Sequence, residues 1–166
     1  MKLDFLYGVC MGGKYYRDVS RLQALREGLE TIKEAVGADV YLLGCGCPLQ
    51  AGLGLVEAMR IGLDTGSPIF RAVPLLGRLV NTFCYRQARR NISARSFLHQ
   101  RWWNNDPDCL LVSDKQQLHP VEREAFVSLL GMTGGQIFLG DSLKNITEEQ
   151  VEKYLRALFS FKDKAL

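Results

Sequence analysis

The sequence predicts an α/β protein built on a parallel sheet, and three observations favour this fold class. Short apolar runs alternate with longer amphipathic segments about five times, in steps of roughly 30 residues, which is typical of successive βα units. The apolar runs are continuous, as expected of strands that are buried on both faces. The chain has 166 residues. Since a complete (βα)₈ barrel typically needs about 250 residues, either an open doubly wound sheet or part of such a barrel fits.

The first half of the chain shows the alternation clearly. The apolar run Leu3–Tyr7 predicts a strand. A helix is expected next, because Ser20 is a good N-cap with Gln23 three residues later and apolar residues then recur at spacings of three and four until Gly37. The run from Val40 to Leu43 predicts a second buried strand.

The second half repeats the pattern. A short apolar unit spans residues 55–62, and Pro74 fits the first turn of a long helix that reaches about Ser93. The remaining elements are expected in this order: a strand at 109–112, a helix from Pro120 to the Gly134–Gly135 pair, a strand at 137–139 and a final helix capped by Thr147 and Gln150.

Composition excludes several classes of protein. Hydrophobic residues make up 47% of the chain, which is enough for a buried core. No stretch approaches the roughly 20 apolar residues of a membrane span, and no secretory signal is visible, so neither a membrane nor a secreted protein is expected. The net charge of +3 argues against a nucleic-acid partner. The five scattered cysteines are typical of reduced thiols in a cytoplasmic protein.

Motifs for a metal or a nucleotide cofactor are weak. Cys45 and Cys47 form one close pair, but a structural zinc site needs a second pair or nearby histidines, and His99 and His119 are both distant in sequence. The glycines near residues 44–54 do not complete a dinucleotide-binding motif. We therefore expect no metal and no cofactor. The arginines between residues 86 and 101, followed by two tryptophans, are interpreted as a solvated basic face rather than a site for single-stranded nucleic acid.

Two aspartates stand where parallel α/β proteins place their sites, at the carboxyl ends of strands. Asp4 lies inside the first apolar run, where a carboxylate is costly to bury unless it is paired or used. Asp64 follows the third apolar unit. Two carboxylates at strand ends are the minimum apparatus for glycoside hydrolysis. From the pattern alone, a solvated residue near the N-terminus and an ordinary loop aspartate remain open alternatives.

Four ordered blocks resemble the melibiase family, the α-galactosidases and relatives of glycoside hydrolase family thirty-six. Residues 2–7 (KLDFLY) resemble the strand F-K-x-D-F-L-Y of that family, and residues 42–49 (LLGCGCPL) resemble its L-L-G-C-G-x-P-L loop. Residues 59–65 (MRIGLDT) match its M-R-I-G-x-D block, and residues 103–111 (WNNDPDCLL) are similar to its W-x-N-D-P-D-C-L-L segment. No single block is specific, whereas the four in order are.

The resemblance implies a fold and a set of site residues. It implies a partial, half-barrel-like TIM barrel that corresponds to barrel strands four to eight, with residues 1–166 forming a single domain that lacks the N-terminal strands. It also implies a retaining double displacement in which Asp4 is the nucleophile and Asp64 the general acid/base. Lys2 and Arg60 match positions that hydrogen-bond sugar hydroxyls, and Cys45 matches a loop cysteine that lies against the sugar.

The expected function is that of an α-galactosidase-like retaining hydrolase fragment, which acts on terminal α-galactosides. The alternative is a catalytically inactive half-barrel scaffold. In both cases an incomplete barrel leaves strand edges unpaired, so we expect self-association into a homodimer or larger oligomer that completes the sheet.

Overall fold

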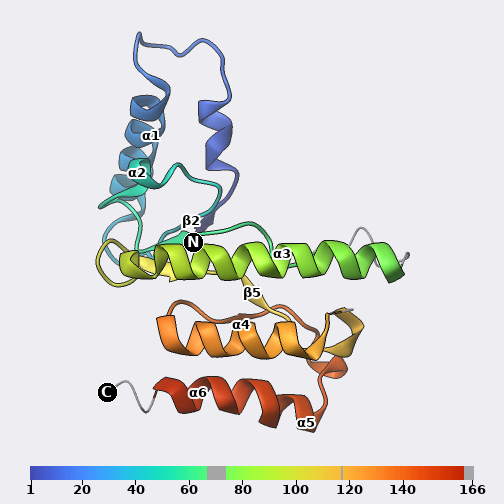
Figure 1. Ribbon diagram of the computed structural model, residues 1–166. Coiled ribbons are helices and arrows are strands. Elements are labelled where there is room, and N and C mark those ends of the chain that lie inside the picture. Colours follow the sequence, from blue (N-terminus) through green and yellow to red (C-terminus); the bar gives the residue numbers. More distant parts are fainter. Residues whose placement is uncertain (67–73, 117, 163–166) are drawn as a thin grey trace. The chain divides into compact units, whose positions relative to one another are not determined.

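The computed structural model describes residues 1–66, 74–116 and 118–162 (Figure 1). Its strands and helices alternate along the chain as the sequence predicts. In chain order they are β1 (Lys2–Leu3), α1 (Arg21–Val36), β2 (Leu43–Gly44), α2 (Leu49–Gly52), β3 (Ala58–Arg60), α3 (Pro74–Arg95), β4 (Asn104–Asp106), β5 (Cys109–Leu110), α4 (Pro120–Thr133), β6 (Phe138–Leu139), α5 (Glu148–Gln150) and α6 (Ala157–Lys162). A π-helical stretch, Val151–Arg156, joins α5 to α6.

The strands form parallel sheets, which confirms the α/β class. One sheet has the strand order β1-β2-β3-β4, and in a second sheet β5 pairs with β6. Both β1 with β2 and β2 with β3 are parallel pairs, and so are β5 and β6. Within the described ranges these strands do not close into a barrel. The correspondence of these strands to barrel strands four to eight stays a prediction.

The described residues group into two compact units. The first comprises residues 1–60 and 100–105, and the second comprises residues 61–99 and 106–166. In the first unit, α1 buries Leu25 and Leu29, and the central strands bury Leu43 and Met59. The expectation of a single domain over residues 1–166 stays a prediction.

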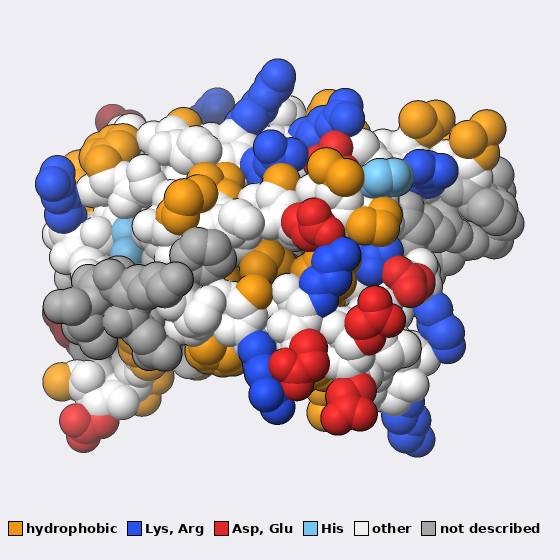
Figure 2. Space-filling view, turned by 60° about the horizontal axis from the view of Figure 1, so that its bottom comes forward, with side chains coloured by type: hydrophobic (Ala, Val, Ile, Leu, Met, Phe, Trp, Pro, Cys, Tyr) orange, Lys and Arg blue, Asp and Glu red, His pale blue; other side chains and the backbone are white. Residues whose placement is uncertain are grey.

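The second unit has the larger apolar core. Helix α3 contributes Tyr85 and Ile92, strand β5 contributes Leu110, and α4 contributes Phe126, all of which are buried in one cluster. The helices α3, α4 and α6 lie side by side in this unit (Figure 1). On the face shown in Figure 2, several basic side chains gather in the upper part, whereas acidic and basic side chains are mixed in the lower right.

Several strand predictions differ from the structure. Of the predicted buried strand from Val40 to Leu43, only Leu43 lies in a strand, β2, and Tyr41 is exposed. The predicted strand Leu3–Tyr7 is only Lys2–Leu3, since Phe5 takes a left-handed backbone conformation with φ of +53° and a 3₁₀ turn then spans Leu6–Cys10. Strand β4 was not predicted, because Asn104–Asp106 is entirely polar and shows no hydrophobic period.

The helix limits agree better with the sequence. Ser20 caps α1 by accepting a hydrogen bond from the backbone N–H of Gln23 at 3.2 Å, and α1 ends before Gly37. Thr147 and Gln150 form the predicted capping box. None of the helices in the described part of the chain is long and apolar enough to cross a membrane.

Candidate functional site

The ends of β1, β2 and β3 place three of the predicted site residues side by side. The register aligns Leu3 with Gly44 and Gly44 with Met59, so the next row along the sheet is Asp4, Cys45 and Arg60. The ladder continues into this row, because the backbone N–H of Cys45 donates to the carbonyl oxygen of Leu3 at 2.8 Å. Parallel strands present their carboxyl ends at one edge of a sheet, which is where such folds hold their sites.

Asp4 is held as a carboxylate by three donors. Hydrogen bonding by the Cys45 thiol is the largest cause that lowers the pKa of Asp4, and the backbone N–H of Phe5 donates to its Oδ1 at 2.8 Å. The ammonium of Lys2 lies 3.5 Å from Oδ2. The bond from Cys45, followed by those from Phe5 and Lys2, lowers the pKa of Asp4, against the opposing effect of partial desolvation. The side chain is half exposed, so an incoming molecule can reach it.

Cys45 acts here as a neutral donor rather than as a nucleophile. Burial, and then the hydrogen bond to Asp4, raise the pKa of Cys45 to about 11, although Arg60 and Lys2 lower it in part. The thiol is therefore protonated at neutral pH, whereas a cysteine nucleophile needs a depressed pKa.

The loop after β2 packs closely on the chain after β1. Gly46 has φ of +60°, and a Cβ on it would lie 2.8 Å from the ring of Tyr7. The backbone N–H of Tyr7 donates to the carbonyl oxygen of Gly46 at 2.6 Å. The ring of Phe5 packs edge-on against that of Tyr7, with centroids 5.8 Å apart. The exposed ring of Phe5 thus stands next to Asp4. The sequence did not indicate this ring as part of the site.

Asp64 belongs to the second unit, four residues after β3. It is exposed, and the next residue is anchored firmly. The backbone N–H of Thr65 donates to Oδ2 of Asp108 at 2.7 Å, and the Thr65 hydroxyl donates to the same oxygen at 3.2 Å and to the carbonyl oxygen of Cys109 at 2.6 Å. The structure thus brings together Lys2, Asp4, Cys45 and Arg60 in the first unit. The pairing of Asp4 with Asp64 stays a prediction.

The chemistry available at this sheet edge is that of an ionised carboxylate beside hydrogen-bond donors. All five cysteines are free thiols. Among the described residues, no three His, Cys, Asp or Glu side chains are grouped so that they could hold a metal ion. A half-exposed carboxylate with fixed donors, next to a buried arginine, can bind hydroxyl groups and attack an electrophilic carbon.

No family model matches the chain. The α-galactosidase from Thermus thermophilus, solved in complex with p-nitrophenyl α-D-galactopyranoside, superposes on 95% of this chain with a TM-score of 0.66 and 26% sequence identity. The fold is α-galactosidase-like. The structure of that enzyme in complex with stachyose gives a TM-score of 0.63 and 25% identity, also over 95% of this chain.

The α-galactosidase-like chain spans about a third of the enzyme that it matches, 32% and 33% of the two solved chains. The similarity supports a TIM-barrel-derived fold and a glycoside-hydrolase-like fragment. The roles of Lys2, Asp4, Cys45, Arg60 and Asp64 rest on the sequence blocks and on the contacts described above.

Proposed function

We propose that this chain is a fragment of a retaining glycoside hydrolase for terminal α-galactosides, with Asp4 as its nucleophile. The observation that carries the proposal is the set of donors from Cys45, Phe5 and Lys2, which keeps Asp4 ionised on an α-galactosidase-like fold. An ionised and accessible carboxylate is what the first step of a double displacement requires.

In the proposed first step, an oxygen of Asp4 attacks the anomeric carbon of the galactoside. The bond between that carbon and the glycosidic oxygen breaks, and protonated Asp64 gives its proton to the departing oxygen. In the second step, Asp64 as a carboxylate takes a proton from water while the water oxygen attacks the anomeric carbon. The ester bond to Asp4 breaks, and the sugar leaves with its original configuration.

Lys2, Cys45 and Arg60 are proposed to hold the sugar. Arg60 is buried, so its guanidinium is restrained and can present several N–H groups to hydroxyl oxygens. The donors on Asp4 also lower its basicity, and a weakly basic carboxylate leaves more readily in the second step. For this effect to operate during the reaction, the Cys45 thiol has to stay close to Asp4 when the sugar is bound.

The test is hydrolysis of p-nitrophenyl α-D-galactopyranoside by the whole chain, beside Asp4→Ala and Asp64→Ala. We expect turnover that either substitution abolishes, while Asp39→Ala, at an exposed loop aspartate of the first unit, retains it. Azide sharpens the assignment. Azide should restore the release of nitrophenol in both variants. The sugar product should be β-galactosyl azide with Asp4→Ala and α-galactosyl azide with Asp64→Ala. Equal turnover in the chain and both variants would contradict the proposal.

A second candidate is an inactive scaffold that self-associates, and the chain's span of about a third of the enzyme favours it. The order of the first sheet puts β1 and β4 at its two edges. Unpaired edges of parallel strands are templates for a second copy. Absence of turnover, together with a dimer mass in sedimentation, would favour this candidate. A monomer mass would count against it.

A further inference from the structure

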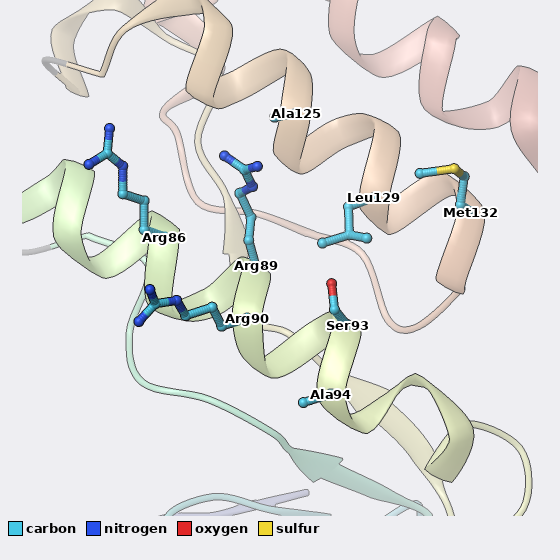
Figure 3. Close-up of a pocket in the computed structure, with 8 residues that line it drawn as sticks. All are labelled: Arg86, Arg89, Arg90, Ser93, Ala94, Ala125, Leu129 and Met132. Atoms are coloured by element: carbon cyan, nitrogen blue, oxygen red, sulfur yellow. The ribbon is translucent and has the colours of Figure 1, made fainter.

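A long groove runs between α3 and α4 in the second unit. One part of it, about 900 Å³ in volume, is lined from α3 by Arg86, Arg89, Arg90, Ser93 and Ala94 and from α4 by Ala125, Leu129 and Met132. The side chains of Arg86 and Arg89 extend from α3 toward α4, and Leu129 extends from α4 toward α3 (Figure 3).

A second hollow of about 680 Å³ extends this groove along the two helices. Arg86 lines both hollows, so they lie next to each other along α3. In the second part, α3 presents Leu75, Leu79 and Phe83 at a spacing of four residues, which puts them on one face of the helix. Leu79 is 61% exposed and Phe83 58% exposed. Apolar side chains gathered in this way mark an interaction site more often than single exposed ones do.

The groove carries more positive than negative side chains. Among the described residues that line it, the charged ones are Arg78, Arg86, Arg89, Arg90 and Glu122. Glu122 is already bound, because its Oε1 accepts from Arg86 and its Oε2 from Arg89, both at 3.0 Å. Each guanidinium carries five N–H groups, so both arginines retain donors for a further carboxylate. Four arginines against one carboxylate leave an excess of three positive charges.

We propose that the groove between α3 and α4 binds an acidic amphipathic helix of a partner protein. The apolar side chains of that helix would pack on Leu79, Phe83 and Met132, and its carboxylates would pair with the arginines. From Leu75 to Ala94 the groove follows α3 for about 28 Å, which corresponds to a partner helix of about 18 residues. The excess positive charge favours an acidic partner over a second copy of this chain, which carries a net charge of +3 and would bring further arginines.

The test uses the whole chain and a labelled helical peptide of about 18 residues, with leucines at every third and fourth position on one face and glutamates beside them. Fluorescence anisotropy should show saturable binding that weakens as the salt concentration rises from about 0.05 M to about 0.5 M. A matched peptide with lysine in place of glutamate should not bind. Equal binding of the two peptides would overturn the proposal.

Two variants locate the binding. Leu79→Asp should weaken the peptide complex about tenfold or more, and Arg90→Glu about fivefold, since these exposed residues supply apolar area and charge. The matched control is Arg101→Glu, the same charge reversal at an exposed arginine outside the groove, and it should change the affinity less than about twofold. Unfolding curves of all three should match that of the unmodified chain. Unchanged affinity in both groove variants would overturn the proposal.

The same variants test two other possible ligands of the groove, a second copy of this chain and an anionic membrane. Self-association that Leu79→Asp removes, without peptide binding, would replace the partner helix by a second copy. Binding to phosphatidylglycerol vesicles in place of the peptide would replace it by an anionic membrane surface. Neither outcome depends on galactoside hydrolysis, so the groove and the proposed function are tested separately.

Discussion

Cys45 stands beside Asp4 at the ends of two parallel, neighbouring strands, and hydrogen bonding between the two side chains is the largest cause that lowers the pKa of Asp4. Each group shifts the pKa of the other. The bond lowers the pKa of Asp4 and, together with burial, raises that of Cys45 to about 11. The pair is therefore a carboxylate and a neutral thiol over the whole range near pH 7, which is the state that the proposed nucleophile requires.

Removing the thiol should raise the pKa of Asp4. In Cys45→Ala the first of its three donors is lost while those from Phe5 and Lys2 remain, so the carboxylate becomes easier to protonate. Cys45→Ser keeps a donor and should leave the pKa of Asp4 close to that of the unmodified chain. Carbon-13 NMR of the labelled carboxyl group, followed from neutral to acidic pH, measures both values.

Cys84→Ala is the control for this titration, since Cys84 lies in the second unit. It should leave the Asp4 titration unchanged. If Cys45→Ala also leaves that titration unchanged, the hydrogen bond between the two side chains is contradicted.

Gly46→Ala should destabilise the chain through two separate effects. A residue at φ of +60° costs about 1 kcal/mol when it carries a Cβ, and here the Cβ would also lie 2.8 Å from the Tyr7 ring. Overpacking adds about 1 to 3 kcal/mol. Gly54→Ala separates the two effects, because Gly54 has φ of +78° with nothing within 4 Å of an added Cβ. In urea unfolding, an equal loss of stability in the two variants would show that Tyr7 does not restrict the loop.

Glu57 should stabilise the first unit in a pH-dependent way. Although desolvation raises its pKa, the hydrogen bond from Lys33 and that from the backbone N–H of Leu42, at 2.7 Å, lower it more, so the net pKa falls below the ordinary value of 4.5. A carboxylate whose folded pKa is depressed stabilises the fold fully above the unfolded pKa, and this contribution is lost as the pH falls through the folded pKa.

We therefore expect the stability of Glu57→Gln to depend less on pH below about pH 4.5 than that of the unmodified chain. Above that pH it should be less stable by an amount that no longer changes with pH. Chemical unfolding at a series of pH values measures this. Glu34→Gln, at an exposed glutamate of α1, is the control, and an identical pH dependence for the two variants would contradict the role of Glu57.

The sequence predicts the order of elements well, because that order depends on local signals. The cap at Ser20, the capping box of Thr147 and Gln150, and the start of α4 at Pro120 are all local side-chain or backbone effects, and all are confirmed. Strand lengths depend instead on which backbone groups find partners across the sheet. The run after Asp4 is apolar enough for a longer strand, yet it turns at Phe5.

The candidate site could be predicted only in part. The strand-end position of Asp4 follows from its place in an apolar run, but its bond to Cys45 requires the register of β1 on β2, which no local pattern specifies. Strand β4 is polar, so a hydrophobic pattern cannot predict it. Its pairing within the sheet defines it: the backbone N–H of Asn104 donates to the carbonyl oxygen of Glu57 at 2.8 Å.

Thr65 should prove more important to the second unit than its position in a loop suggests. Thr65 is buried, and the two acceptors within reach of its hydroxyl are the carboxylate of Asp108, just before β5, and the carbonyl oxygen of Cys109, the first residue of β5. Thr65→Val keeps the shape and removes the donor, which costs about 1 to 3 kcal/mol when the acceptors are buried. Thr65→Ser keeps the donor and loses one methyl group, about 0.8 kcal/mol.

The comparison of these two variants separates hydrogen bonding from packing. If hydrogen bonds hold the loop, the free energy of unfolding from urea titration should fall more in Thr65→Val than in Thr65→Ser, whereas packing alone would reverse the order. Thr31→Val is the matched control, since its hydroxyl is exposed and bonds only within α1, to the carbonyl oxygen of Glu27 at 2.9 Å. That change should stay within about 0.5 kcal/mol. Because Asp64 directly precedes Thr65, a larger loss in Thr65→Val would also mean that the Thr65 hydroxyl helps to fix the backbone that carries the proposed acid/base.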